Sequence, residues 1–186
     1  MPVFHGYQWC HGGDEDDFMT RSEFRDRLDQ VTADPDVNTH AASIADLRKD
    51  YPHTVEVLPS DRPLPSYNCV MHALGLIGLT QAGVSPGHAA PVQFVQYLID
   101  NGHLTSCKAR PGVMVTWSTS GKLAHIGKLT KDPSRAESKL GLGPLLSHRL
   151  DEVPSRYGKL SGYYAPIPPE EARRQLDAYV DGIASR

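Results

Sequence analysis

The stretch Ser66-Tyr67-Asn68-Cys69-Val70-Met71-His72-Ala73-Leu74 decides the fold that we expect. Its apolar residues recur at helical spacing and predict a buried helix over residues 67–79, with Gly83 as the stop signal. A proline-rich segment, residues 59–65, precedes the helix and should hold its start at the surface. A cysteine in the first helical turn feels the positive end of the helix dipole, which lowers the pKa of its thiol. The free backbone amides there can also stabilise an oxyanion. The stretch therefore predicts a thiol nucleophile at Cys69.

The rest of the chain contains helices first and strands later. Helical periodicity predicts helices over residues 21–31, 41–47 and 91–102, and a terminal amphipathic helix over residues 168–185. After Pro111-Gly112 the apolar period changes to that of strands, which we expect at residues 113–117, 122–129, 137–140, 145–150 and 159–164. Helices followed by an antiparallel meander indicate an α+β fold.

A thiolate needs a partner that accepts its proton and later returns it. His125 lies in the middle of the expected 122–129 strand, on the face opposite Ala124 and Ile126. A strand packed against the nucleophile helix would aim this imidazole at the helix start. The pattern therefore predicts a Cys69/His125 pair.

Five short motifs in order give the chain a family resemblance. They are Tyr67-Asn68-Cys69, His125, Ser138-Lys139-Leu140-Gly141, His148 and Tyr157-Gly158. This YNC…H…SKxG…H…YG pattern, over residues 66–165, resembles a family of uncharacterised bacterial proteins related to the NlpC/P60-type cysteine peptidases. The resemblance implies a papain-like fold, with the nucleophile helix packed on an antiparallel sheet. NlpC/P60 enzymes usually have Asp before the cysteine and Ser-Gly after it, where this chain has Asn68, Val70 and Met71. Cell-wall peptide specificity is therefore not carried over.

A third group should orient the histidine, and three residues are candidates. Glu137 and Ser138 lie on the next expected strand, and His148 lies on the strand after it. Alternation along a strand means that only one of Glu137 and Ser138 can reach His125. The NlpC/P60 pattern places its third polar residue about a dozen positions beyond the base, which favours this pair, and Ser138 belongs to the SKxG motif. His148 is the chemically more familiar orienting residue, so the choice stays open.

Composition narrows the range of partners and compartments. The 186-residue chain has a formal charge of −3 and a pI near 6.3, which give no electrostatic reason to expect nucleic acid or an anionic membrane as a partner. Its three cysteines form no CxxC pair, which argues against a disulfide framework. No stretch approaches the about 20 apolar residues that span a bilayer, and the N-terminus lacks signal-peptide features. We expect a cytoplasmic protein, although export by a specialised secretion system would leave the same sequence.

These observations predict a cysteine hydrolase or acyl transferase that attacks an amide bond of a peptide or protein and forms a thioester, with no cofactor and no metal. Peptidase, amidase, deamidase and transglutaminase reactions share this first half. We expect residues 1–60 to be an N-terminal helical extension that packs on the catalytic domain or covers its cleft. Residues 61–166 should form the papain-like domain, and residues 167–186 the C-terminal helix.

Alternative functions use the same residues differently. On the same fold, Cys69 would serve only packing in a non-catalytic protein-binding module. A secreted toxin or effector would use the thiol for deamidase or transglutaminase chemistry. A metal-binding protein would use His5, Cys10 and His11, but their spacing matches no familiar zinc site. His148 and Tyr157 also have structural interpretations, as the end of a strand and as part of a turn with Gly158.

Overall fold

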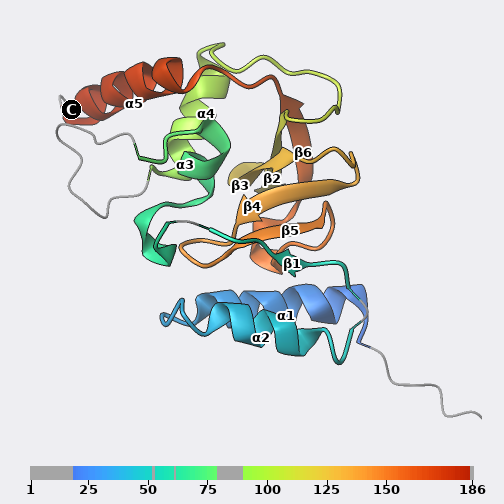
Figure 1. Cartoon of the computed structure of the whole chain (residues 1–186). Coiled ribbons are helices and arrows are strands. Elements are labelled where there is room, and N and C mark those ends of the chain that lie inside the picture. The colour runs from blue at the N-terminus through green and yellow to red at the C-terminus, as the bar shows by residue number, and fades with distance from the viewer. Residues whose placement is uncertain (1–18, 52, 61, 79–89, 185–186) are drawn as a thin grey trace, which may run out of the picture.

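The computed structural model describes residues 19–51, 53–60, 62–78 and 90–184. The chain forms an α+β fold around one six-stranded sheet (Figure 1). The helices are α1 (Arg21–Ala33), α2 (His40–Leu47), α3 (Cys69–Leu74), α4 (Val92–Asp100) and α5 (Pro169–Ala184), with 3₁₀ turns η1 (Leu64–Ser66) and η2 (Ser155–Tyr157). The strands are β1 (Glu56–Val57), β2 (Met114–Thr119), β3 (Lys122–Leu129), β4 (Arg135–Lys139), β5 (Leu145–Arg149) and β6 (Lys159–Tyr164).

Every pairing in the sheet is antiparallel, in the order β1-β5-β4-β3-β2-β6. Consecutive strands β2 to β5 form a meander, and β6 returns to the free edge of β2. The predicted bounds of β3 and β6 are confirmed, and the other three expected strands and all five expected helices are present with shifted ends. The α+β expectation is therefore confirmed.

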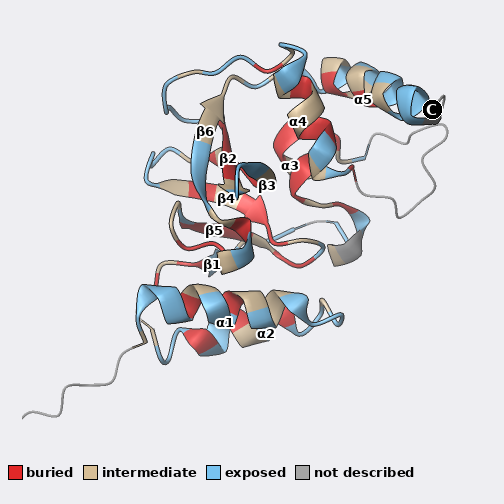
Figure 2. Cartoon of the chain, turned by 180° about the vertical axis from the view of Figure 1, so that it is seen from behind, coloured by how far each residue is buried: buried red, intermediate tan, exposed pale blue. Residues whose placement is uncertain are grey.

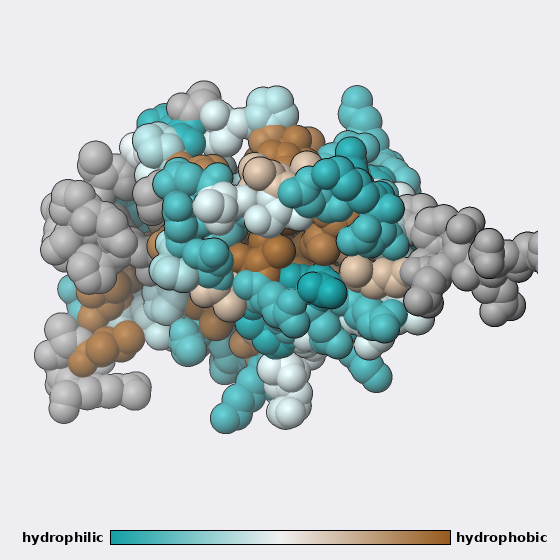
Figure 3. Space-filling model, turned by 90° about the horizontal axis from the view of Figure 1, so that it is seen from below, coloured by the Kyte–Doolittle hydropathy of each residue, from teal (hydrophilic) through white to brown (hydrophobic). Residues whose placement is uncertain are grey.

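Two hydrophobic clusters cover the two faces of this sheet. The first joins α1 and α2 to alternate residues of β2, including Val115 and Trp117. The second joins α3, α4 and α5 to Met114 and Ile126, which point to the other face. The outer surfaces of the helices are exposed, and their inner surfaces are buried (Figure 2). Seen from the α1–α2 side, hydrophilic side chains cover most of the outer surface, with hydrophobic residues between them (Figure 3).

Local signals explain where the helices begin and end. Thr20 and Glu23 form a reciprocal capping box that starts α1. α3 is shorter than the expected 67–79 helix, because Gly75 adopts the left-handed conformation (φ 69°) and ends it. The predicted stop, Gly83, lies outside the described residues. No helix in the described parts of the chain combines the length and apolar character needed to cross a membrane.

Residues from the expected N-terminal extension are built into the main body. β1 pairs with β5, so the proposed boundary at residue 60 does not separate this segment from the sheet. Arg25 of α1 donates hydrogen bonds to the carbonyls of Val153 (2.8 Å) and Gly158 (2.5 Å). Asp29 accepts hydrogen bonds from the backbone and guanidinium of Arg156. The described part of the extension therefore packs on the rest of the fold.

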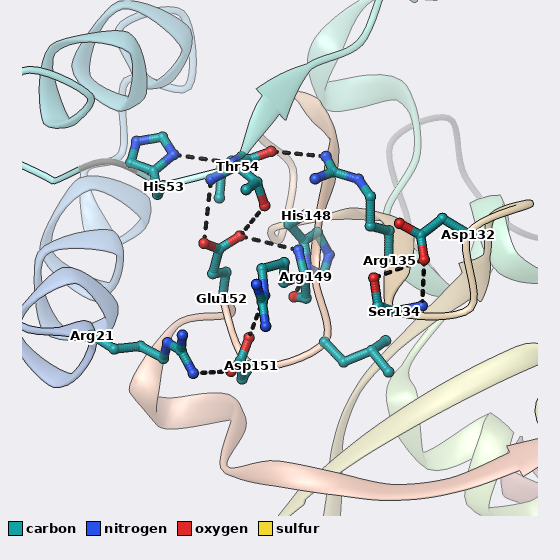
Figure 4. Close-up of polar contacts among 12 residues, drawn as sticks. Arg21, His53, Thr54, Asp132, Ser134, Arg135, His148, Arg149, Asp151 and Glu152 are labelled. Carbon is teal, nitrogen blue, oxygen red and sulfur yellow. Dashed lines mark hydrogen bonds and ion pairs between the residues drawn. The ribbon is translucent and has the colours of Figure 1, made fainter.

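A buried carboxylate fixes the turn after β5 to the segment before β1 (Figure 4). Glu152, 3% exposed, accepts hydrogen bonds from the backbone amide (3.3 Å) and hydroxyl (2.7 Å) of Thr54. It also accepts one from the backbone amide of Arg149 (3.1 Å). This arrangement fixes the turn that carries the Arg149 carbonyl, which contacts the candidate site.

Candidate active site

Cys69 is the first residue of α3, as the sequence predicts. Asn68 is the N-cap, and its side-chain oxygen accepts a hydrogen bond from the Met71 amide (3.1 Å). Its side-chain nitrogen donates to the Ala90 carbonyl (2.7 Å), which ties the helix start to the segment before α4. Asn68 therefore fixes the position of the cysteine.

The Cys69 thiol is more deeply buried than the sequence suggests. The residue is 9% exposed, and burial raises the pKa of its thiol to about 11. Backbone groups of Ile126 and Val70 and the charge of Lys139 lower this pKa, but they do not offset the burial. The expectation of a lowered thiol pKa is therefore wrong, because a surface position for the helix start was assumed.

His125 is fully buried on the face of the sheet that carries Trp117. Its ring stacks on Tyr157, with centroids 4.2 Å apart and planes at 4°, and lies 5.3 Å from the Trp117 ring. Burial lowers the pKa of His125 well below its usual value, and the neighbouring His148 and Arg156 lower it further. The imidazole is therefore neutral at pH 7.

A chain of hydrogen bonds leads from His125 to the backbone. The Nε2 atom of His125 lies 2.9 Å from the Ser138 hydroxyl, which lies 2.8 Å from Nε2 of His148. Nδ1 of His148 donates to the carbonyl of Arg149 (2.8 Å), and both residues are drawn in Figure 4. Ser138 and His148, weighed as alternatives from the sequence, thus lie in series.

The Arg149 carbonyl determines the proton positions along this chain. A carbonyl only accepts, so Nδ1 of His148 carries the proton and its Nε2, in the neutral ring, is an acceptor. The Ser138 hydroxyl then donates to His148 and accepts from Nε2–H of His125. Nδ1 of His125 is left with its lone pair, and this atom is buried without a hydrogen-bond partner. The network therefore holds His125 as a base.

Strand alternation excludes Glu137 from this network. Ser138 reaches His125, whereas Glu137 is half-buried and points to the other face, where it lines a shallow pocket with Lys131 and Ser147. The geometric prediction that only one of the pair reaches His125, with Ser138 favoured, is confirmed. The catalytic roles stay predictions.

Irregular pairing of β3 shapes the site. A register shift opposite Trp117 and Ser118 leaves Ala124 unpaired, and Ala124 packs with the first cluster instead of opposite His125. β3 pairs with β4 only through Lys128 and Leu129. Gly127 allows the strands to approach, because a Cβ there would lie 2.8 Å from the Glu137 carbonyl oxygen and 3.0 Å from Cβ of Ser138.

The thiol and the imidazole lie on different sides of β3, so the expectation that this strand aims His125 at the start of α3 is not met. Cys69 packs in the second cluster, and its sulfur interacts with the backbone of Ile126, the residue after His125. Its charge also raises the pKa of Tyr157, the ring that stacks on His125. Neither ring nitrogen of His125 is hydrogen-bonded to the sulfur. A productive pair therefore needs the two side chains to approach each other, and catalytic contacts do tighten in this way when substrate binds.

Sequence reasoning gave no role to Lys139 and only a structural one to Tyr157. Lys139 belongs to the quoted SKxG motif, and that motif was the only signal for it. Tyr157 belongs to the Tyr-Gly motif, and its ring, 9% exposed, covers one face of His125. Cys107 is a half-buried free thiol that packs against the first cluster.

The metal alternative falls outside the described residues, because His5, Cys10 and His11 lie there. Among the described residues, no group of three or more His, Cys, Asp and Glu side chains is arranged to hold a metal ion. Comparisons with protein-family models, curated proteins and solved structures give no match to this chain.

Proposed function

We propose that this chain is a papain-like cysteine hydrolase or acyl transferase that acts on an amide bond of a peptide or protein. The observation that carries the proposal is the chain from Arg149 through His148 and Ser138, which leaves Nδ1 of His125 as a buried, unpartnered base. This base lies next to the residue whose backbone contacts the thiol of Cys69. A nucleophile, a base and an orienting group are the components of covalent acyl transfer.

In the proposed reaction, the Cys69 sulfur attacks the amide carbon while its proton passes to Nδ1 of His125. The amide oxygen becomes an oxyanion, to which the backbone amide of Cys69 donates a hydrogen bond. His125 then gives the proton to the leaving amine, and a thioester remains. Water, activated by the same Nδ1, releases the acid. An acceptor amine in place of water would give a transglutaminase.

The proposed reaction requires the proton to move at the moment of attack, because both groups are neutral at rest. The pKa of the Cys69 thiol is raised to about 11, and the pKa of His125 is well below its usual value. Both groups are therefore neutral at pH 7, in contrast to a resting thiolate–imidazolium pair. The imidazolium that forms during attack keeps its Nε2–H bond to Ser138, which in turn donates to His148.

One observation favours the non-catalytic alternative. Cys69 is 9% exposed and belongs to a hydrophobic cluster, which is the usual state of an inert cysteine. The two functions differ in whether the thiol reacts through His125.

Intact-mass analysis with an electrophilic amide-mimicking probe distinguishes the cysteine hydrolase from the non-catalytic binding module. The native chain should gain one adduct at pH 7, and Cys69→Ala should gain none at this site. His125→Ala should react more slowly. Cys107→Ala is the matched control and should react like the native chain. Labelling of Cys69 at the same rate with and without His125, or no labelling of folded protein, would support the binding module.

A further inference from the structure

Lys139 is a fully buried lysine at the end of β4, on the strand face opposite Ser138. Its Nζ atom donates a hydrogen bond to the Leu64 carbonyl (2.5 Å) and lies 3.6 Å from the centroid of the Tyr67 ring. Among the ion pairs of the described residues, none involves Lys139. The ammonium is thus removed from water and has only neutral partners there.

Burial of such a charge without a counter-ion is costly. A carbonyl oxygen and an aromatic face each offset part of this cost, the ring through its electron-rich face. Neither is an anion. The geometry therefore leaves Lys139 able to stabilise a negative charge that forms beside it.

The group beside it that can become negative is the thiol of Cys69. Both partners of Lys139 lie in the segment that leads into α3, and Tyr67 is two residues before the cysteine. The charges of Lys139 and Cys69 affect each other, since each moves the other toward its ionised form. His125 cannot supply this positive charge at rest, because its imidazole is neutral at pH 7.

We propose that Lys139 is the counter-ion of the Cys69 thiolate. This inference rests on the proposed function, because it assigns the charge balance of that nucleophile. Two residues then stabilise the ionised thiol: His125 accepts its proton, and the Lys139 ammonium stabilises the negative charge that remains on sulfur. The structural alternative is that Lys139 serves only as a clamp, with its hydrogen bond to Leu64 holding the approach to the helix.

Burial disfavours the charged form of both groups, because it lowers the pKa of Lys139 and raises that of Cys69. Their opposite charges act against both shifts, since each charge favours the ionised form of the other group. Loss of one proton from the pair gives either a neutral amine beside a thiol or an ammonium beside a thiolate. These two forms exchange by moving a single proton, so the pair titrates as a unit.

The test is a pH titration of the thiolate by its ultraviolet absorbance, taken as the difference between each folded protein and the same protein with Cys69→Ala. We expect the thiolate midpoint to rise by about one pH unit or more in Lys139→Met and in Lys139→Gln, which is a roughly tenfold smaller thiolate fraction below the midpoint. Lys131→Gln removes an exposed lysine with the same change in net charge, and its midpoint should stay at the native value.

The two Lys139 variants distinguish the effect of the positive charge from the effect of the hydrogen bond to Leu64. Gln keeps a donor for the Leu64 carbonyl, whereas Met keeps only the side-chain volume. A raised midpoint in both supports the counter-ion. A native midpoint in both, or in Gln alone, overturns it.

A reciprocal measurement covers the case in which both Lys139 variants fail to fold. Carbon NMR of labelled lysines should show a lower Lys139 pKa in Cys69→Ser than in the native chain, and no change in Cys107→Ser. An unchanged Lys139 pKa in Cys69→Ser overturns the proposal. Failure of the proposed function gives a different result, since the midpoint would still depend on Lys139 while labelling and turnover would not depend on His125.

Discussion

Replacement of Ser138 by alanine tests the hydrogen-bond chain at its central atom. The Ser138 side chain is fully buried, and its hydroxyl joins Nε2 of His125 (2.9 Å) to Nε2 of His148 (2.8 Å). Its removal leaves two buried ring nitrogens without partners, each at a cost of about 1–3 kcal/mol. We therefore expect Ser138→Ala to lower the free energy of unfolding by about 2–6 kcal/mol, which is a large part of the ~5–15 kcal/mol typical of a domain.

The same change should slow the chemistry, because the tautomer and orientation of His125 are no longer fixed. We expect probe labelling or turnover to fall roughly 10- to 100-fold, less than the full effect of a general base. Urea unfolding measures the stability, and labelling kinetics are measured under conditions in which the variant is folded.

Ser147→Ala is the matched control for this experiment. Ser147 lies on β5 beside His148, but its hydroxyl points to the other face and accepts hydrogen bonds from Arg135 (3.2 and 2.9 Å). Its loss should reduce stability and leave labelling at the native rate. Native labelling by folded Ser138→Ala, or an equal loss in Ser147→Ala, would refute the proposed role of the chain.

Three further predictions follow from the same contacts. Burial lowers the pKa of His148 from 6.5 to about 4, so below pH 6.5 the unfolded chain binds a proton that the folded chain does not. The contribution of this group to the free energy of unfolding should be constant above pH 7 and fall toward pH 4 by up to about 3 kcal/mol, and in urea unfolding His148→Gln should weaken the slope between pH 7 and pH 4. Gly127→Ala should push β3 away from β4, lower the free energy of unfolding by about 1–3 kcal/mol and slow the labelling of Cys69. Gly182→Ala, which has open space around it, should change neither the stability nor the labelling rate. Glu152→Ala should remove the acceptor shared by Thr54 and Arg149 and lower the midpoint of thermal unfolding; an unchanged midpoint would contradict that role.

Strand and site geometry that depends on local pattern could be predicted from the sequence. The alternation of apolar and polar residues predicted the bounds of β3 and β6. It also predicted that Ser138 and Glu137 point to opposite faces, so that only one of them reaches His125. The helix-start position of Cys69 followed from the apolar spacing after it.

Features that depend on partners distant in the chain could not be predicted. β1 is two residues long and carries no apolar alternation, so only its pairing with β5 defines it. Lysine is usually exposed, and the burial of Lys139 depends on Leu64 and Tyr67, far upstream in the chain. The raised pKa of Cys69 has the same origin, since the segments that bury it come from other parts of the sequence.

The contacts between α1 and the turn around η2 set the order in which the chain can fold as it is synthesised. α1 leaves the ribosome before the strands of the sheet, but Arg25 finds its acceptors only at Val153 and Gly158. Phe24 and Leu28 belong to a core cluster completed by strand residues from 113 onward and by Tyr157. Until those strands are synthesised, part of the apolar face of this helix stays uncovered, and binding by a chaperone then competes with aggregation.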